Sequence, residues 1–312
     1  MRAHVREQHG MQVTECIGRT PLVRLERIPQ QHGVPADVQI LGKAEWFNPG
    51  GSIKDRAALQ IVKEAMEQGL LRPGMTLLDA TSGNTGIAYA MIGAAWGFSV
   101  TLVVPESISE ERRRILQAYG AQLLFSDPYE GTDGAIRLAR ELAAREPDRY
   151  FYADQYSNPA NWRAHYNGTG VEIIEQTDGA VTHLVAGLGT TGTMMGTGRR
   201  LKEFNPAITL VGVQPDDAFH GLEGLKHLTT AIVPAIYDPS VIDRMEFVNT
   251  DEAFAMARQL AREEGLFVGP SAAAAVVAAF RVARELDHGV IVVILPDSGV
   301  KYLSTPLWQD GS

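Results

Sequence analysis

A lysine at the start of a predicted helix is the residue around which the chemistry of this chain can be built. Lys54 lies in the segment NPGGSIKDR, residues 48–56, where a glycine-rich turn leads into an apolar pattern that predicts a helix as far as Gly69, with Ser52 as its N-cap. An ammonium group is unfavourable there, because positive partial charge accumulates at a helix N-terminus. A buried lysine amine has a lowered pKa and can form a Schiff base with an aldehyde. Lys54 is therefore a candidate for covalent catalysis.

A second polar segment, TSGNTG at residues 81–86, follows a predicted strand and opens a predicted helix. Its hydroxyls, its amide and its backbone N–H groups suit a carboxylate or a phosphate at a helix N-terminus. An ordinary N-cap with a tight turn would use similar residues, but four polar side chains with two glycines are more than a cap requires. We expect an anion site that includes Thr81, Ser82, Asn84 and Thr85.

A third segment, GLGTTGT at residues 187–193, follows the predicted strand 183–186. Its spacing matches the GxGxxG dinucleotide fingerprint, which requires an acidic residue near the end of the next strand. Asp216 and Asp217 lie close to that position, so a dinucleotide site stays open here. The hydroxyls and backbone amides of the loop suit a single terminal phosphate better than a pyrophosphate over bare glycine. The candidate phosphate ligands are Gly189, Thr190, Thr191, Gly192 and Thr193. Ser271, in the segment GPS, starts another helix and alone indicates only an N-cap.

Alternating strand and helix patterns position these loops. The predicted strands are 39–45, 76–80, 99–104, 121–125, 150–152, 183–186, 208–213 and 290–295, and the predicted helices include 85–96, 110–119, 133–145, 161–175, 251–264 and 272–286. This alternation is typical of βαβ units and a parallel sheet. In an open α/β sheet, ligands bind at the carboxyl ends of the strands, where the polar segments lie. Residues 215–239 show no clean period and are predicted to form a functional loop.

Composition limits the class of ligand. The chain has 312 residues, of which 45% are hydrophobic, and this is enough for two lobes around a shared cleft. The 28 basic and 37 acidic residues give a net charge of -9, so no basic footprint indicates nucleic acid or an anionic membrane. The single cysteine, Cys16, allows no disulfide within the chain, and the histidines show no metal-ligand spacing. With no signal-peptide or membrane-span pattern, we expect a cytoplasmic protein that has a small-molecule ligand and no metal.

Taken together, a Schiff-base lysine, an anion loop, a phosphate loop and a helix-opening serine make a site for pyridoxal 5'-phosphate (PLP). The segments NPGGSIKDR, TSGNTG, GTTGT, GPSA and DSGVKYLST resemble those of the cysteine synthases (O-acetylserine sulfhydrylases), which are fold type II PLP enzymes. The resemblance extends from about residue 18 to residue 305. It implies an α/β fold with two open, twisted, mostly parallel sheets flanked by helices, as in the tryptophan synthase β subunit. PLP would lie in the cleft between a smaller mobile lobe, 46–149, and a larger lobe, 12–45 plus 150–312, which binds the cofactor phosphate.

The same resemblance assigns roles to the candidate residues. Lys54 would carry PLP as a Schiff base and then act as the general base, and Asn84 would bond the ring hydroxyl. The substrate carboxylate would be held by Thr81, Ser82, Thr85 and Gln155. Residues 189–193 would hold the cofactor phosphate, and Ser271 would face the pyridine nitrogen. A neutral serine there leaves the ring a weaker electron sink, which favours β-elimination over transamination.

The implied reaction is β-replacement. An activated serine would lose its leaving group, and the resulting aminoacrylate would add a sulfur nucleophile to give cysteine. The segments AGLGTTGTMMGTGR and DSGVKYLST look closest to the branch that uses O-phosphoserine and the thiocarboxylate of a small sulfur-carrier protein. In that branch Lys226 is the candidate for holding the substrate phosphate, although Asp216, Asp217 and Glu223 make the same loop acidic. Ala273 departs from the glycine that is usual in the family. The resemblance also implies a homodimer.

Other functions remain open on the sequence alone. A serine or threonine dehydratase and a cystathionine β-synthase share the fold and the lysine, and release of pyruvate from serine without a thiol would identify a dehydratase. A protein of another class, a catalytically inactive binding module for the C-terminus of a partner, would carry no cofactor colour.

Overall fold

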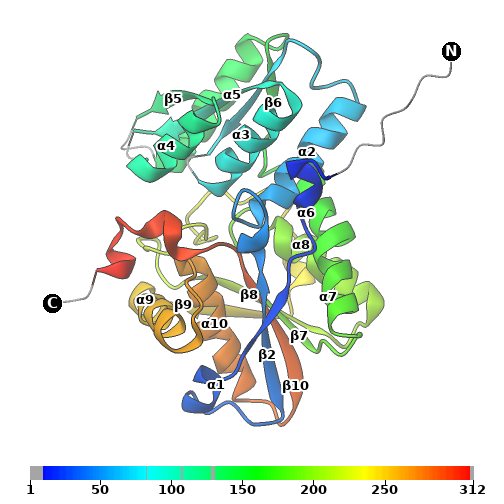
Figure 1. Cartoon of the computed structure of the whole chain (residues 1–312), viewed down its shortest axis with the longest axis vertical. Coiled ribbons are helices and arrows are strands. Elements are labelled where there is room, and N and C mark those ends of the chain that lie inside the picture. Colours follow the sequence, from blue (N-terminus) through cyan, green and yellow to red (C-terminus); the bar gives the residue numbers. More distant parts are fainter. Residues whose placement is uncertain (1–9, 82, 107, 128–130, 310–312) are drawn as a thin grey trace.

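The computed structural model describes residues 10–309 except 82, 107 and 128–130, and it shows a chain built on two separate β-sheets (Figure 1). One sheet has six strands in the order β1-β2-β10-β7-β8-β9, and the other has four in the order β5-β4-β3-β6. All neighbouring strands run parallel except β1 and β2. The predicted fold class, with two open and mostly parallel sheets flanked by helices, is confirmed.

The six-stranded sheet has an apolar core on each face. Its strands are β1 (Leu22–Leu25), β2 (Val38–Ala44), β7 (His183–Gly187), β8 (Thr209–Pro215), β9 (Arg244–Val248) and β10 (Gly289–Leu295). Ile291 and Val293 of β10 pack in one core, with α9 (Thr250–Gln259) and α10 (Pro270–Ala283), whereas Val292 and Ile294 pack in the other, with α7 (Gly170–Gln176) and α8 (Gly192–Phe204). Successive side chains of a strand point to opposite faces, so a strand that is apolar throughout supplies both cores.

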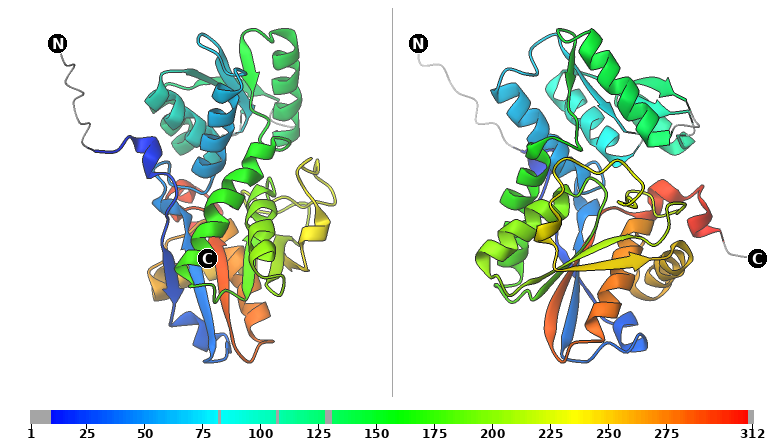
Figure 2. Two further views of the ribbon diagram at one scale, coloured as in Figure 1. Left: turned by 90° about the vertical axis from the view of Figure 1, so that its right-hand side faces the viewer. Right: turned by 180° about the vertical axis from the view of Figure 1, so that it is seen from behind.

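The four-stranded sheet is built in the same way. Its strands are β3 (Thr76–Ala80), β4 (Ser99–Pro105), β5 (Gln122–Ser126) and β6 (Tyr150–Tyr152). Leu77 of β3 packs in a core with α2 (Lys54–Glu67) and α3 (Asn84–Trp96), and Leu78 packs in the opposite core with α5 (Gly131–Arg145). The chain enters this part after β2 and leaves it after β6. The helix α4 (Glu110–Ala118) lies beside α3, and α6 (Pro159–Ala164) lies beside α2. Figure 2 shows the two parts, one above the other, from two further sides.

Short helical turns complete the described chain. They are the helix α1 (Ile28–Gln31), the 3-10 turns Val13–Cys16, Glu45–Phe47, Pro239–Val241, Gly299–Tyr302 and Pro306–Trp308, and the π-helical turns His165–Thr169 and Leu260–Glu264. No helix in the described ranges is long and apolar enough to cross a lipid bilayer.

Three details correct the predictions made from the sequence. Ser52 is not the N-cap of α2, because Ile53 occupies that position, and the Ser52 hydroxyl oxygen accepts the Lys54 N–H at 3.2 Å. The predicted helices 161–175 and 251–264 are each interrupted by a π-helical turn. The edge strand β9, which pairs with β8 alone, was not predicted, since its sequence RMEFV has charged residues at two of five positions and no apolar run.

Candidate active site

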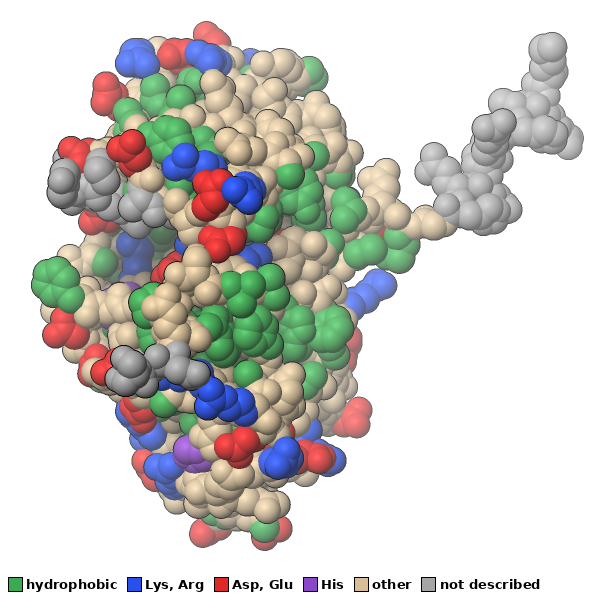
Figure 3. Space-filling view, turned by 60° about the vertical axis from the view of Figure 1, so that its left-hand side comes forward, with side chains coloured by type: hydrophobic (Ala, Val, Ile, Leu, Met, Phe, Trp, Pro, Cys, Tyr) green, Lys and Arg blue, Asp and Glu red, His purple; other side chains and the backbone are tan. Residues whose placement is uncertain are grey.

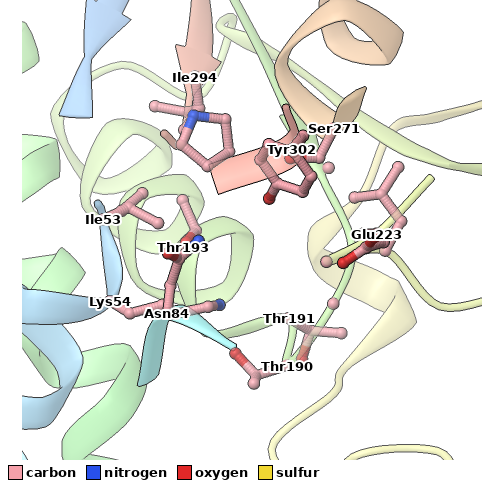
Figure 4. Close-up of a pocket in the computed structure, with 15 residues that line it drawn as sticks. Ile53, Lys54, Asn84, Thr190, Thr191, Thr193, Glu223, Ser271, Ile294 and Tyr302 are labelled. Atoms are coloured by element: carbon pink, nitrogen blue, oxygen red, sulfur yellow. The ribbon is translucent and has the colours of Figure 1, made fainter. Parts of the chain in front are cut away.

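Two adjoining cavities lie where the strands of both sheets end, between the two parts of the molecule. The inner cavity is formed mainly by the six-stranded part and the turn before α2; Figure 4 shows it. The outer cavity opens between the carboxyl ends of β3 and β8, and the space-filling view in Figure 3 shows a hollow between the upper and lower parts with basic side chains inside it. Both cavities are lined by Lys54, Asn84, Gly189, Thr190, Glu223, Gly224, Leu225 and Tyr302.

Lys54 is the first residue of α2 and lines both cavities. The preceding turn is held on both sides. The N–H of Ile53 donates to the carbonyl of Pro296 at 2.9 Å, and the N–H of Gly50 donates to the Asp55 carboxylate at 2.6 Å. A Cβ atom on Gly50 would lie 2.4 Å from that carboxylate, so the turn requires glycine there. Burial lowers the pKa of Lys54 to about 8, and the negative charge of Asp297 partly opposes this shift.

The loop between β7 and α8 has the features of a phosphate site. Thr191 occupies the N-cap position of α8, a helix of 13 residues, with a left-handed φ of 67° that L-residues seldom adopt. Its buried Oγ1 has no hydrogen-bond partner within the described residues. A Cβ atom added to Gly189 would lie 2.2 Å from the Gly224 carbonyl oxygen. A Cβ atom added to Gly192 would lie 2.0 Å from the Asn161 side chain. Glycines that let backbone segments approach closely, a hydroxyl without a partner in the described chain and a helix N-terminus together fit a bound phosphate group.

The loop after β3 lies on the outer cavity together with Gln155. Thr81, Thr85 and Gln155 all line this cavity, and the Thr85 hydroxyl donates to Gln155 Oε1 at 2.7 Å. The predicted Ser82 lies outside the described residues. Asn161, which the sequence did not single out, joins the segment of Gln155 to the phosphate loop: its amide donates to the Gln155 carbonyl at 2.7 Å and to Thr190 Oγ1 at 3.1 Å. Its only sequence signal is its place in the segment that follows Gln155.

Ser271 lies in the first turn of α10 and borders the inner cavity. It is 5% exposed, and its hydroxyl faces Gly224. A Cβ atom added to Gly224 would lie 3.8 Å from the Ser271 Oγ atom. The helix behind it is almost entirely buried and consists largely of alanine, so α10 packs closely against the sheet and holds Ser271 on a rigid element. Ala273 is part of this buried face.

Charged side chains surround the outer cavity. Arg112 of α4 forms an ion pair with Glu223 at 2.6 Å, and its guanidinium lies over the Tyr302 ring, 5.2 Å from the ring centre. The Lys226 amine lies 4.9 Å from the centre of the Tyr156 ring, and burial lowers the pKa of Lys226. Glu223 and Lys226 belong to the loop predicted to be functional, whereas nothing in the sequence distinguishes Arg112 from the other arginines of its helix.

The structure brings the predicted site residues together from both parts of the chain. The following line one cavity or both: Lys54, Thr81, Asn84, Thr85, Gln155, Gly189, Thr190, Thr191, Thr193, Lys226 and Ser271. Gly192 stands between two of them at the start of α8. His165 is buried beneath the phosphate loop, where its ring hydrogen-bonds to Thr169 at 2.9 Å.

The model of one protein family, "Pyridoxal-phosphate dependent enzyme", matches residues 13–297. The chain belongs to this family. Within it, a cysteine synthase from Aquifex aeolicus is 52% identical over 303 residues, which cover 96% of this chain and 92% of that protein. A cysteine synthase B from Pseudomonas aeruginosa is 44% identical over 297 residues, which cover 95% of this chain and 97% of that protein. The solved structure of a cysteine synthase from Entamoeba histolytica has a TM-score of 0.93 at 36% identity and covers 98% of this chain and 93% of that chain.

These similarities place the chain among the cysteine synthases of the PLP-dependent family. The predicted cofactor is therefore confirmed as PLP, and the dinucleotide interpretation of the GLGTTG spacing is wrong. The features of the inner cavity agree with this cofactor, because an aldehyde with one phosphate group needs a lysine and a single phosphate loop.

Proposed function

We propose that this enzyme makes cysteine by replacing the β-substituent of an activated serine with a sulfur nucleophile. The observation that carries the proposal is the place of Lys54, where a cavity with a phosphate loop meets a cavity with an anion loop. Residues 189–193 would hold the cofactor phosphate, Asn84 the ring hydroxyl, and Ser271 would face the ring nitrogen. Bound PLP supplies the electron sink that allows an amino acid to lose its α-proton and its β-substituent.

The residues around the outer cavity would then position the substrate and move its proton. Thr81, Ser82, Thr85 and Gln155 would hold the substrate carboxylate. An amine whose pKa is about 8 can accept and return a proton near neutral pH, so Lys54 suits the role of general base. This assignment explains why a lysine stands at a helix N-terminus, where it does not stabilise the helix.

We further propose that residues 46–149 move as a lobe against residues 12–45 and 150–312. The two sheets have separate apolar cores, which allows each part to stay intact during such a motion. The loop 81–86 belongs to the smaller lobe, whereas the phosphate loop and Ser271 belong to the larger one. Closure on a bound substrate would exclude water from the reacting groups.

For the substrate, we propose O-phosphoserine with Lys226 as the residue that holds its phosphate, and O-acetylserine as the alternative. Glu223 pairs with Arg112, and no ion pair joins Lys226 to a carboxylate of the described chain. Lys226 is therefore the basic group of the outer cavity best placed to receive an anion. The segments that resemble the O-phosphoserine branch also support the thiocarboxylate of a small carrier protein as sulfur donor, beside sulfide. The resemblance to the cysteine synthases as a whole supports a homodimer as the assembly.

The test compares the two serine esters in the purified enzyme and in Lys226→Ala. A hydrogen bond to a charged group contributes about 1.5 to 3 kcal/mol, so kcat/KM for O-phosphoserine should fall about 10- to 100-fold. For O-acetylserine it should change little, and Lys63→Ala, at an exposed position of α2, is the matched control. An unchanged preference in Lys226→Ala would refute the phosphate assignment.

The reaction itself is tested with the wild-type protein. We expect a visible absorption band from bound PLP that changes when either ester is added, and formation of cysteine when sulfide follows. Pyruvate as the main product from serine without any thiol would indicate a dehydratase instead. If no band develops even with added PLP, the proposed chemistry fails and a binding module for a partner's C-terminus becomes the better interpretation.

A further inference from the structure

Four side chains form a continuous hydrogen-bonded row beside Lys54. The Lys301 amine donates to Asn84 Oδ1 at 2.6 Å, Asn84 Nδ2 donates to Asp297 Oδ2 at 2.7 Å, and the Tyr302 hydroxyl donates to the same oxygen at 2.7 Å. Asn84 and Tyr302 line the cavities together with Lys54, whereas Asp297 and Lys301 lie behind them. The row therefore connects the buried charges of Asp297 and Lys301 to side chains that line the cavities.

The row fixes the orientation of the Asn84 carboxamide. An ammonium can only donate and a carboxylate can only accept, so the oxygen of the carboxamide must face Lys301 and its nitrogen must face Asp297. One N–H of Asn84 is used by Asp297, and the other is left for a group in the cleft. A reversed carboxamide would place two acceptors against each other and two donors against each other.

Asp297 itself cannot move easily. It is 1% exposed, its carbonyl accepts the Gly269 N–H at 3.2 Å, and its backbone forms a bridge with Ser52. A Cβ atom on Gly269 would lie 2.3 Å from Asp297 Oδ1, so this carboxylate oxygen occupies the space directly beside the backbone that leads to Ser271. The neighbouring backbone of Ile53 is held by Pro296. The carboxylate is thus anchored to the segments that carry Lys54 and Ser271.

Charges from several elements meet at this carboxylate. Lys301 and Arg112 act on it with positive charge, and Tyr302 and Asn84 donate hydrogen bonds to it. Although burial raises the pKa of Asp297, these groups favour its ionised form. Burial lowers the pKa of Lys54, and the negative charge of Asp297 opposes this shift.

We propose that Asp297 is a positioning residue that acts through Asn84 and on Lys54: it fixes the carboxamide that faces the cofactor, and its negative charge stabilises a positive charge on the Lys54 nitrogen. The part that concerns the cofactor rests on the proposed function. The part that concerns Lys54 does not, because it holds for the protein without PLP. Asp297 is not a catalytic residue in this proposal, since it lies behind Asn84.

The first test uses the full-length protein freed of PLP. Acetylation of Lys54 by acetic anhydride is followed by peptide mass spectrometry as a function of pH, because only the neutral amine reacts. A negative charge that partly opposes the effect of burial holds the Lys54 pKa up, so in Asp297→Asn the midpoint should fall to a lower pH. Asp79→Asn removes another fully buried carboxylate, which does not act on Lys54, and should leave the midpoint unchanged.

The second test uses the PLP-loaded protein and follows the pH titration of its visible band. In Asp297→Asn the midpoint should again fall to a lower pH. Asp297→Ser, which also removes the charge, serves if the asparagine variant does not fold. Midpoints equal to those of the wild type in both tests would overturn the proposal. If the wild type shows no band, the proposed function fails, and the acetylation test alone decides the effect on Lys54.

Discussion

At the scale of single residues, Asp79 is a buried carboxyl group with a predictable effect on stability. It is fully buried at the end of β3, where its carboxylate accepts the Ala80 N–H at 2.8 Å. Burial is the main reason why its pKa is raised from 3.8 to about 7, and the nearby charge of Asp154 adds to the shift. The folded protein therefore binds a proton that the unfolded chain releases between these values, and stability should decrease as pH rises from about 4 to 7.

We predict that Asp79→Asn raises the melting temperature by a few degrees at pH 8 and makes it less dependent on pH between 4 and 7. The amide oxygen of asparagine can still accept the Ala80 N–H, so the substitution removes the charge and keeps the hydrogen bond. Differential scanning calorimetry at several pH values measures both effects. Asp148→Asn, at a fully exposed side chain, is the control. If Asp79→Asn instead lowers the melting temperature at pH 8, the ionised Asp79 carboxylate does not destabilise the folded protein.

Residues of the site differ in how far the sequence could reveal them. Lys54 and Thr191 were predicted because their segments combine glycines with polar groups where a helix starts. Asp297 belongs to a segment that the sequence singled out, but its contact with Asn84 joins the C-terminal part of the chain to α3 and has no local signature. The same holds for the pairing of Arg112 with Glu223. Contacts between distant segments depend on the packing of the two sheets, which composition and periodicity do not specify.

At the scale of elements, most strands and the loops after them were predicted, whereas the edge strand β9 and the interruptions of two helices were not. The strand 76–80 has the predicted bounds because its apolar run is bordered by turn residues. The π-helical turns at 165–169 and 260–264 were missed, since one extra residue in a turn hardly changes the apolar period. The first of these turns lies beneath the phosphate loop, and His165, its first residue, reaches Thr193 at 3.5 Å.

The phosphate loop should not tolerate a side chain at its first predicted ligand. In Gly189→Ala the new Cβ would lie 2.2 Å from the Gly224 backbone oxygen, so one of the two loops must shift. We predict that the dissociation constant of PLP rises at least about tenfold, which corresponds to about 1.4 kcal/mol. Titration of the cofactor-free protein with PLP, followed by absorbance, measures this change.

Gly83→Ala is the control for that experiment, because no heavy atom lies within 4 Å of its added Cβ and its φ is not left-handed. Gly83 borders the outer cavity, so this variant should keep its affinity for PLP even if substrate binding changes. Equal affinities for PLP in the two variants would mean that the loop 187–193 adapts to a side chain and does not bind the cofactor through a close backbone approach.

At the scale of the whole molecule, a buried network of charges joins the lysine helix to the six-stranded part. Arg56 of α2 pairs with Glu45 at 2.7 Å and with Glu172 of α7 at 2.6 Å, and Lys43 of β2 pairs with Glu172 at 2.7 Å. Thr20 closes the network through its hydroxyl, which donates to Glu45 at 2.6 Å. Chain length and the family resemblance predicted two lobes around a cleft. They gave no indication of this network, since charged residues on a helix usually face water.

Removal of Arg56 should loosen the connection between the lysine helix and the rest of the molecule. Arg56→Ala leaves two carboxylates without their main partner, and breaking a buried ion pair costs about 3 to 5 kcal/mol of unfolding free energy. The change is measured as the shift of the urea-unfolding midpoint at pH 7. Arg149→Ala breaks an exposed pair with Glu146 and should have little effect, because exposed ion pairs are screened by solvent.

The effect of Arg56→Ala on the free energy of unfolding should also depend on pH. Burial alone would raise the pKa of Glu172, but its hydrogen bonds from Arg56 and Lys43 lower it to about 2. Its contribution to stability is therefore complete above about pH 4.5 and is lost as pH falls toward 2. The difference in stability between the wild type and Arg56→Ala should become smaller over that range. A difference that stays constant down to pH 2 would mean that Arg56 stabilises the molecule by packing and not by its charge.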